Sequence, residues 1–575
     1  MYKIVDKVYD GKIFYGYGLY DLESNREFDA DINSVKIYVA QGWVQDVGIN
    51  NKGELHSISK SFDLRKLNHR QIYKNKLSTF LVGEALKKEC SKATLYNTRY
   101  CFNTLINYIS DTSNKVFIIY GLRRTGKTTI IHQAINHLGY IGCAFISLNK
   151  NDKSLDLLET LDYCLNSGYK YVFIDEITEL NDILYFIATL ADKYVTLGMK
   201  IIISGTDSYK LALASNSALY DRYEGVKTTY ISFKEYNMLL GATDIEKYIE
   251  LGGVLKQDAF YNESETHKYL TTSISENVEH TIDMVGRQQF GKLHDLIGMG
   301  LFKRYLELAI QHTNEELTAN IIAEEYKSRD VGSVKQLLES TLDLDSLLEL
   351  DDITEQIRYA LRVSNIGGDS ESNRHMAEEF FDAFIDIFNA LDLVVYSKHY
   401  YVHSNRKMSE NEHIIFTLAG LRFNQLKETI IAFMKDARFQ GLSKNDRNII
   451  KNKLISDVYG QLAEQLILVE LMTSFGKERV YKLNDFRGRE IDCVVEVNDS
   501  EIDLIEVKWN DKCTKQQCNN LVNHEFGELI EERTGYKVRN RIVLYRGENT
   551  NKFLDDYIIH YININKFLLD THKYI

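Results

Sequence analysis

An eight-residue segment lies between an apolar run and a stretch whose apolar residues recur at the spacing of a helix. This segment constrains the fold of the chain more than any other feature. Residues 121–128 read GLRRTGKT; they follow the run VFIIY directly and open the stretch KTTIIHQAINHL. Glycines at this spacing let backbone N–H groups curl round a polyphosphate, at the N-terminus of a helix whose dipole favours anions. The segment therefore predicts a β-strand, a phosphate-binding loop and an α-helix, in that order.

The same segment predicts ATP and Mg²⁺ as cofactors. Lys127 is expected to meet the β and γ phosphates, and Thr128 is expected to hold Mg²⁺ through its hydroxyl group. The other predicted nucleotide-binding positions in this segment are Gly121, Arg124, Thr125, Gly126 and Thr129. An ATPase of this kind also needs acidic groups that hold the metal and activate water.

Two acids follow a second apolar run, one strand–helix unit further along the chain. Residues 171–174 read YVFI and are followed by Asp175 and Glu176. A buried strand here would deliver both carboxylates to the carboxyl edge of the sheet, where α/β proteins bind ligands. Asp175 is predicted to hold Mg²⁺, and Glu176 is predicted to polarise the attacking water.

Three further residues in this region have competing explanations. The strand expected at 201–204 ends in polar residues, so Ser204 or Thr206 could contact a γ-phosphate; a plain turn explains them equally well. Arg222, in the sequence LYDRY, fits an arginine finger that stabilises charge during hydrolysis. A surface ion pair explains the same arginine as often.

The patterning between residues 115 and 232 predicts an α/β domain. Stretches of helical period separate the apolar runs, which are KVFIIYG, GCAFISLN, YKYVFIDE, KIIISGTD and KTTYISF. This alternation is typical of βα units on a parallel sheet.

The remaining sequence divides into further domains, as a chain of 575 residues allows. The predicted organisation is a small β-rich module at 1–50, a helical lead-in at 51–110, the α/β domain at 111–254, a helical and winged-helix-like region at 255–440, and a C-terminal α/β domain at 441–575. In the fourth segment, amphipathic helices are interrupted by a loop at 364–373. A helix that ends near Leu391 then precedes a two-stranded hairpin.

Asp492, Glu506 and Lys508 match the D…ExK pattern of restriction-endonuclease-like nucleases. Residues i and i+2 of a strand share a face, and a turn near 498–500 would bring Asp492 beside Glu506 and Lys508. Asp492 and Glu506 could bind Mg²⁺, while Lys508 positions hydroxide or steadies charge on the phosphate. Glu464, on a predicted preceding helix, is a further catalytic acid of such sites.

The alternative for these acids is ordinary charge alternation on surface strands, in a chain that is 26% charged. Asp492 and Glu506 lie inside the apolar runs IDCVVEV and IDLIEVKW, however, where an unpaired acid would be costly. This environment favours a functional site.

Five ordered phrases resemble the bacterial and archaeal AAA-type P-loop ATPases: YGLRRTGKTT, FIDEI, SGTDS, LYDRY and ISFKEY. TLAGLRFNQ and IVLYRGEN resemble the same group, except that Ala419 and Gly420 stand where its members usually have Pro-Gly. The resemblance implies an α/β multidomain protein: an AAA-type domain with a parallel sheet, a helical and winged-helix-like middle, and a C-terminal restriction-endonuclease-like (PD-(D/E)XK) domain.

Composition narrows the class of protein. The net charge of −13 argues against a surface wholly devoted to nucleic acid, although a local basic groove remains possible. No apolar run approaches the roughly 18 residues needed to cross a bilayer, so no membrane partner is expected. The start of the chain lacks the apolar core of a signal peptide, and the seven cysteines have no secreted-framework spacing. These features predict a cytoplasmic protein.

Together these observations predict a Mg²⁺-dependent ATPase coupled to a C-terminal nuclease-like domain that engages nucleic acid, with DNA as the expected partner. The same domain is a candidate metal-dependent nuclease that cleaves this nucleic acid. A homo-oligomer through the ATPase domain would let Arg222 serve a neighbouring subunit. The alternative is an ATP-driven switch or remodeller that acts on protein, with the nuclease-like fold kept as a non-cleaving binding module.

Overall fold

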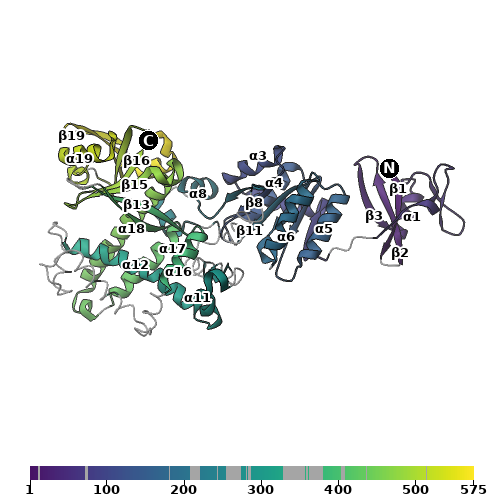
Figure 1. The fold of residues 1–575 in the computed structure, drawn as a ribbon, viewed down its shortest axis with the longest axis horizontal. Coiled ribbons are helices and arrows are strands. Elements are labelled where there is room, and N and C mark those ends of the chain that lie inside the picture. Colours follow the sequence, from purple (N-terminus) through teal and green to yellow (C-terminus); the bar gives the residue numbers. More distant parts are fainter. Residues whose placement is uncertain are drawn as a thin grey trace.

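Three bodies lie in a row along the long axis of the molecule (Figure 1). They are an N-terminal module, an α/β domain and a larger C-terminal body. The computed structural model describes residues 1–10, 13–71, 76–180, 182–206, 221–241, 244–253, 255, 274–276, 278–279, 281–282, 287–327, 338, 357, 361, 380–402, 408–435, 437–512 and 514–575. The loop predicted at 364–373 lies outside these residues. None of the described helices is long and apolar enough to span a bilayer.

The N-terminal module is a four-stranded sheet ordered β3-β2-β1-β6, with one helix and a small two-stranded sheet. Its elements are β1 (Tyr2–Asp10), β2 (Ile13–Asp21), β3 (Arg26–Asp31), α1 (Ile32–Ala40), β4 (Val47–Ile49), β5 (Leu55–Ser57) and β6 (His69–Gln71). Ile4, Leu19 and Val35 are buried at its centre. Because β6 pairs with β1, the module continues into the segment predicted as a helical lead-in.

The α/β domain has a six-stranded sheet ordered β12-β8-β11-β10-β9-β7. Its elements are β7 (Thr79–Val82), α2 (Gly83–Ser91), α3 (Cys101–Ser110), β8 (Val116–Tyr120), α4 (Lys127–Leu138), β9 (Cys143–Ser147), α5 (Ser154–Asn166), β10 (Tyr171–Asp175), α6 (Ile183–Thr189), β11 (Lys200–Gly205) and β12 (Tyr223–Lys227). Strands β8 to β12 are parallel, and β7 is antiparallel to β9. Because parallel strands of this kind are buried on both faces of the sheet, their sequences are continuous apolar runs.

The fifth parallel strand is not where the sequence predicts it. The run KTTYISF at 227–233 was expected to form it, but β12 occupies Tyr223–Lys227. As an edge strand, β12 exposes part of its side chains, so its sequence YEGVK carries little apolar signal. The apolar residues that follow, Ile231 and Phe233, are buried in the C-terminal body instead.

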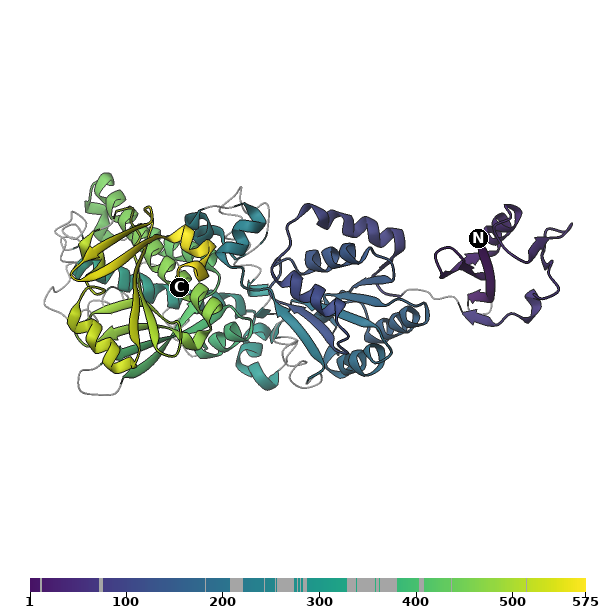
Figure 2. The ribbon, with the colours of Figure 1, turned by 90° about the horizontal axis from the view of Figure 1, so that it is seen from above.

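The C-terminal body contains an eight-stranded sheet ordered β14-β13-β15-β16-β17-β18-β20-β19. Its described elements are α8 (Phe233–Leu240), α9 (Ile245–Leu251), α11 (Arg287–Gly298), α12 (Phe302–Lys327), α16 (Phe381–Ala390), β13 (Val394–Val402), β14 (Ser409–Phe416), α17 (Ala419–Phe433), α18 (Lys444–Phe475), β15 (Val480–Asp485), β16 (Glu490–Glu496), β17 (Glu501–Val507), α19 (His524–Thr534), β18 (Lys537–Tyr545), β19 (Thr550–Leu554), β20 (Tyr557–Asn563) and α20 (Ile564–Leu569). Seen from above, this body and the α/β domain are adjacent, and the N-terminal module stands apart (Figure 2).

The helix and hairpin predicted as winged-helix-like take a different place. Helix α16 and strands β13 and β14 form as expected, and the two strands are antiparallel. However, β13 also pairs in parallel with β15, from Lys398↔Tyr481 to Val402↔Asp485. The hairpin is therefore the edge of the C-terminal sheet and not a free wing. Local patterning could not reveal this pairing, because the two strands are far apart in the sequence.

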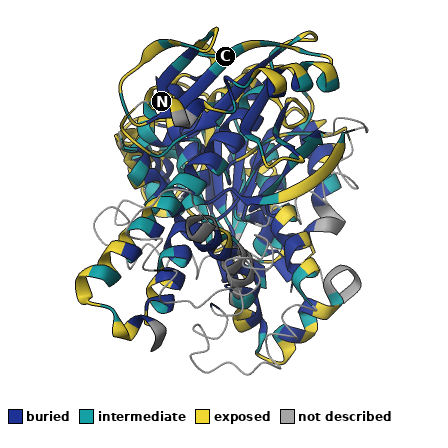
Figure 3. Ribbon diagram, turned by 90° about the vertical axis from the view of Figure 1, so that its left-hand side faces the viewer, coloured by how far each residue is buried: buried dark blue, intermediate teal, exposed yellow. Residues whose placement is uncertain are grey.

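Helices α8 and α9 follow the sheet of the α/β domain in the sequence but pack in the core of the C-terminal body. Phe233, Tyr236 and Ile249 are buried in the same cluster as residues of α17, α18, β16 and β17. Figure 3 views the molecule from this end, and buried segments in dark blue form its interior. From Leu462 to Met472, α18 is buried except at Gln465, which is partly exposed. It therefore carries its two acids, Glu464 and Glu470, into the protein interior.

Candidate nucleotide site and carboxylate cluster

The loop at 121–126 joins β8 to α4 and has the backbone geometry that its glycines predict. Gly121 and Gly126 have φ angles of +147° and +91°, which side-chain-bearing residues rarely adopt. A Cβ atom at Gly121 would lie 2.4 Å from the Thr228 Oγ1 atom and 2.8 Å from the Thr229 nitrogen. Glycine is therefore required at this position, because the loop packs directly on the residues after β12.

Lys127 is the first residue of α4, and its side chain turns back into the loop. The ammonium group donates to the carbonyl oxygens of Gly121 and Leu122, at 2.9 Å each. The residue is only 5% exposed. Burial lowers the pKa of Lys127, while Glu176 and Asp175 act in the opposite direction. The loop thus holds the buried Lys127 ammonium at the place where the sequence predicts phosphate binding.

The predicted metal ligands Thr128 and Asp175 are in contact. The Thr128 hydroxyl donates to Asp175 Oδ2 at 2.7 Å, and the Ser204 hydroxyl donates to the other oxygen, Oδ1. Ser204 therefore lies against the predicted metal ligand and orients it. A hydroxyl and a carboxylate are oxygen donors of the kind that Mg²⁺ prefers, so this pair fits the ion.

Glu176, the predicted water-activating acid, is held by Thr206 at the end of β11. The Thr206 hydroxyl lies 3.0 Å from Oε1 and 2.8 Å from Oε2 of Glu176. Glu176 has a φ angle of +54°, an uncommon conformation for a residue with a side chain. Such backbone conformations concentrate at functional sites, where the surrounding structure maintains them.

A cleft of about 730 Å³ opens beside the loop and extends the site. Its lining combines Arg123, Arg124, residues 126–130 and Glu176 with three other groups: Leu95, Tyr96, Asn97 and Arg99; Gln133; and Leu239, Leu240 and Leu255. The Gln133 amide donates to the Tyr96 carbonyl oxygen at 3.0 Å and so fixes the first of these groups. This wall is apolar and amide-lined, as expected where a nucleoside would lie. No motif in the sequence marks these residues.

Arg222 does not reach the nucleotide site of its own chain. It immediately precedes β12, and its carbonyl oxygen accepts from the Val116 amide at the start of β8. It therefore lies at the amino edge of the sheet, whereas the phosphate-binding loop follows the carboxyl end of β8. Its guanidinium contacts Asp192 at 2.5 Å, and both side chains are about half exposed.

The C-terminal sheet brings Asp492, Glu506 and Lys508 together from two antiparallel strands. The Lys508 ammonium lies 3.2 Å from Asp492 Oδ2 and 2.5 Å from Glu506 Oε2. The Val507 amide also donates to Asp492 Oδ2, at 2.7 Å. The three residues that the sequence grouped by their spacing thus form one contact cluster.

Glu464 joins this cluster through residues that sequence reasoning missed. Lys482 of β15 forms ion pairs with both Glu464 and Glu490. Carboxylate oxygens of Glu464, Glu490 and Asp492 lie within 4.8 Å of one another, a spacing that could hold a metal ion. Glu490 precedes Asp492 by two residues on β16, so the strand period could have identified it. Lys482 lies on a strand that was not predicted.

Burial dominates the electrostatics of this carboxylate cluster. It raises the pKa of Glu464 to about 7, against the opposing effect of Lys482. It also raises the pKa of Glu506, and the nearby Asp492 charge adds to that shift. Burial opposes ionisation of Asp492 too, but the Lys508 and Lys482 ammonium groups hold its pKa below the ordinary value.

Glu506 has one carboxylate oxygen whose hydrogen-bonding capacity is not used. The residue is 3% exposed, and within the described part of the chain no donor reaches its Oε1 atom. A buried polar atom without a partner is costly, and such atoms commonly mark a missing ion or water. The donor set of Asp492 and Glu506 consists of hard oxygen ligands and fits Mg²⁺ or Mn²⁺.

Two family models match the chain. Residues 113–237 match the AAA domain, and residues 459–567 match a domain of unknown function, DUF4143. The first match covers β8 to β12, the loop and both acids at the end of β10. The chain therefore contains a P-loop ATPase domain of the AAA type. The second match covers the carboxylate cluster and assigns no activity to it.

One curated relative is an uncharacterized protein of Methanocaldococcus jannaschii, 32% identical over 130 residues. The match covers 21% of this chain and 28% of that protein, so it spans well under a third of the relative's length.

Solved structures with some likeness to this chain have low sequence identity to it. A Walker-type ATPase of Pyrococcus abyssi is 13% identical, covers 56% of this chain and 93% of its own, and has a TM-score of 0.24. AMPPCP-bound DnaA from Aquifex aeolicus is 17% identical, with coverages of 53% and 96% and a TM-score of 0.19. ORC1 of Aeropyrum pernix in complex with DNA is 13% identical, with coverages of 59% and 93% and a TM-score of 0.20. Scores this low carry no argument about this chain's arrangement or partners.

Proposed function

We propose that this protein is a Mg²⁺-dependent ATPase whose nucleotide cycle controls a C-terminal domain that engages and cleaves DNA. The observation that supports DNA cleavage by the C-terminal domain is the buried Oε1 atom of Glu506, which has no hydrogen-bond partner among the described residues and lies beside Asp492 and Lys508. The Lys508 ammonium pairs with Oε2 of Glu506 and leaves Oε1 available for a further ligand.

In the ATPase half, each residue has a role that follows from its position. The backbone amides of the loop and the Lys127 ammonium bind the phosphates, while Thr128 and Asp175 hold Mg²⁺. Glu176 polarises the attacking water, and Thr206 keeps its carboxylate in place. The cleft beside Gln133 and Leu239 receives the nucleoside.

In the nuclease-like half, Asp492 and Glu506 would hold a divalent metal ion. When bound, that ion would supply charge for activating water and for stabilising the leaving oxygen of a phosphodiester. Lys508 presents a cation to the same place and would bind the phosphate. The order of elements supports this proposal: a helix carrying Glu464, a strand pair carrying Asp492 and Glu506, a second helix, and a strand parallel to β17.

A second candidate is an ATP-driven switch that acts on protein, with a C-terminal domain that binds without cutting. One observation favours it: Lys482 and Lys508 already contact all four carboxylates of the cluster. Two ammonium groups placed in this way reduce the attraction of the site for a divalent cation.

An ATPase assay with a panel of additions separates the two candidates. The proposal requires that duplex or single-stranded DNA raise the rate of ATP hydrolysis, and that the protein cut at least one DNA form with Mn²⁺ or Mg²⁺. Stimulation by protein but not by DNA or RNA, without cutting, would favour the switch. The two outcomes are read from phosphate release and from gel analysis of the same reactions.

A further inference from the structure

Arg99, which precedes α3 and lies outside every recognised motif, is buried against the phosphate-binding loop. It is 6% exposed, and its guanidinium donates to the Thr125 carbonyl oxygen of the loop at 2.8 Å. It also donates to the carbonyl oxygens of Thr228 at 2.8 Å and Tyr230 at 3.1 Å. One side chain therefore ties the loop to the segment that leaves the ATPase sheet.

The same guanidinium binds Glu235 of α8 through two hydrogen bonds. Nε lies 3.0 Å from Oε1, and Nη2 lies 2.7 Å from Oε2. Glu235 is 5% exposed and also accepts from the Tyr100 amide at 2.8 Å. A bidentate pair of this kind has a fixed geometry, so Arg99 sets the position of α8 relative to the loop.

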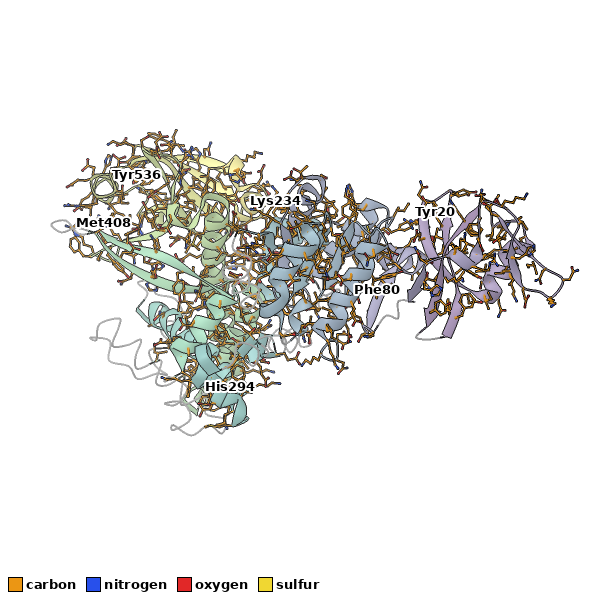
Figure 4. All side chains as sticks on the ribbon, turned by 45° about the vertical axis from the view of Figure 1, so that its right-hand side comes forward. Tyr20, Phe80, Lys234, His294, Met408 and Tyr536 are labelled. Carbon is orange, nitrogen blue, oxygen red and sulfur yellow. The ribbon has the colours of Figure 1, made fainter. Side chains whose placement is uncertain are left out.

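Glu470 of α18 holds the other side of α8. Its Oε1 atom accepts from the Tyr230 hydroxyl and from the Phe233 amide, at 2.7 Å each. Phe233 is the first residue of α8, so a carboxylate of α18 binds the N-terminus of that helix, where the dipole favours negative charge. Figure 4 labels Lys234, the next residue of α8, at the junction between the α/β domain and the C-terminal body.

Helix α18 also carries Glu464 of the carboxylate cluster. Glu464 and Glu470 are six positions apart, which is about 9 Å along a helix axis. Glu464 is paired with Lys482, which contacts Glu490 in turn. An unbroken set of buried contacts therefore runs from the loop through Arg99, α8 and α18 to the cluster.

We propose that Arg99 and Glu470 are positioning residues that couple nucleotide binding to the carboxylate cluster. Leu239 and Leu240 of α8 line the same cleft as the loop, so a nucleotide bound there would contact both elements. Any change in the spacing between loop and α8 acts on α18 through Glu470. The inference rests on the proposed ATP site, and it requires no cleavage by the C-terminal domain.

Hydrogen exchange read by mass spectrometry tests this coupling in the full chain. AMP-PNP with Mg²⁺ is expected to slow amide exchange in residues 121–138 and to change it in residues 459–475 and 490–508. Glu470→Ala is expected to keep the first effect and to lose the second. Asp503→Asn is the matched control, because Asp503 is also a buried carboxylate of this body but pairs with Arg539 of the neighbouring strand. The control is expected to keep both effects.

Two results would overturn the coupling while leaving ATP binding intact. One is slowed exchange at 121–138 in the wild-type protein with no change at 459–475. The other is a wild-type response at 459–475 in Glu470→Ala. If that variant fails to fold, Tyr230→Phe removes only the hydroxyl bonded to Glu470 and is expected to weaken the distant response. No slowing at 121–138 would contradict the ATP site itself and the inference with it.

Discussion

The Thr206 hydroxyl lies within hydrogen-bond distance of both carboxylate oxygens of Glu176, and the two residues directly follow the neighbouring strands β11 and β10. This contact fixes the direction of the acid that is proposed to polarise the attacking water. Thr206→Val removes the contact and keeps the shape of the side chain. We expect kcat for ATP hydrolysis to fall by about tenfold or more, because correct placement of a general base is worth at least that much. KM should change little, and Thr206→Ser should restore most of the rate in steady-state assays.

Substitutions in the two motifs of the ATPase domain should affect different functions, namely ATP binding and ATP hydrolysis. Lys127→Ala removes a buried cation from the phosphate site, so calorimetric titration should show loss of ATP binding. Glu176→Gln keeps the binding contacts and loses only the group that activates water, so it should bind ATP and not hydrolyse it. Hydrolysis by Glu176→Gln at the wild-type rate would show that Glu176 does not have this role.

Arg222 lies at the opposite edge of the sheet from its own loop, so a catalytic role would require a neighbouring subunit. In that case ATP hydrolysis should depend on protein concentration. Mixing Arg222→Ala with Glu176→Gln should restore some activity, because some mixed sites then contain both intact residues. A protein that is monomeric by light scattering with ATP, yet hydrolyses at full specific rate, would exclude this role.

The proposed nuclease site predicts a metal requirement. Asp492 and Glu506 repel each other and a phosphodiester unless a cation lies between them, so cutting should be absent in EDTA and return with Mg²⁺ or Mn²⁺. Asp492→Ala and Lys508→Ala should each abolish cutting and leave DNA-independent ATP turnover unchanged. Metal binding should weaken in Asp492→Ala and persist in Lys508→Ala.

Asp503→Asn is the control for these variants, since it changes a buried acid of β17 that is bonded to Arg539. Cutting that survives Asp492→Ala would place the activity elsewhere. If wild-type protein with ATP and Mn²⁺ cuts no form of DNA and no RNA, the binding-module candidate becomes the better account.

Stability should depend on pH through Glu470. Burial raises its pKa to about 7, although the Tyr230 hydroxyl and Phe233 amide favour its ionised form. A carboxyl group whose folded pKa is raised stabilises the fold below its unfolded pKa, near 4.5, and this contribution is lost as pH rises towards 7. Glu470→Gln removes the titration and retains an acceptor oxygen. We expect its unfolding free energy to exceed that of the wild type by up to about 3 kcal/mol above pH 7.

Melting temperatures of the two proteins at pH 5 and pH 8 check this expectation. The advantage of Glu470→Gln should be larger at pH 8. An equal difference at both pH values would mean that Glu470 has an ordinary pKa in the folded protein.

The sequence by itself determined the features whose residues are contiguous. The loop at 121–128 and the acids at the end of β10 belong to short segments, so a strand, a turn and a helix start suffice to define them. The spacing of Glu506 and Lys508 is likewise a property of one chain segment. In these cases the local backbone geometry places the side chains, so the spacing of the residues in the sequence is enough to predict where the side chains lie.

Only the tertiary structure decided the contacts between distant segments. Arg99, Glu235 and Glu470 belong to no motif in the sequence, but the packing of α8 between two bodies buries all three. Lys482 reaches Glu464 because β15 lies between β13 and β16 in the sheet. Strand order and helix packing follow from the burial of apolar surface over the whole chain, which no local spacing encodes.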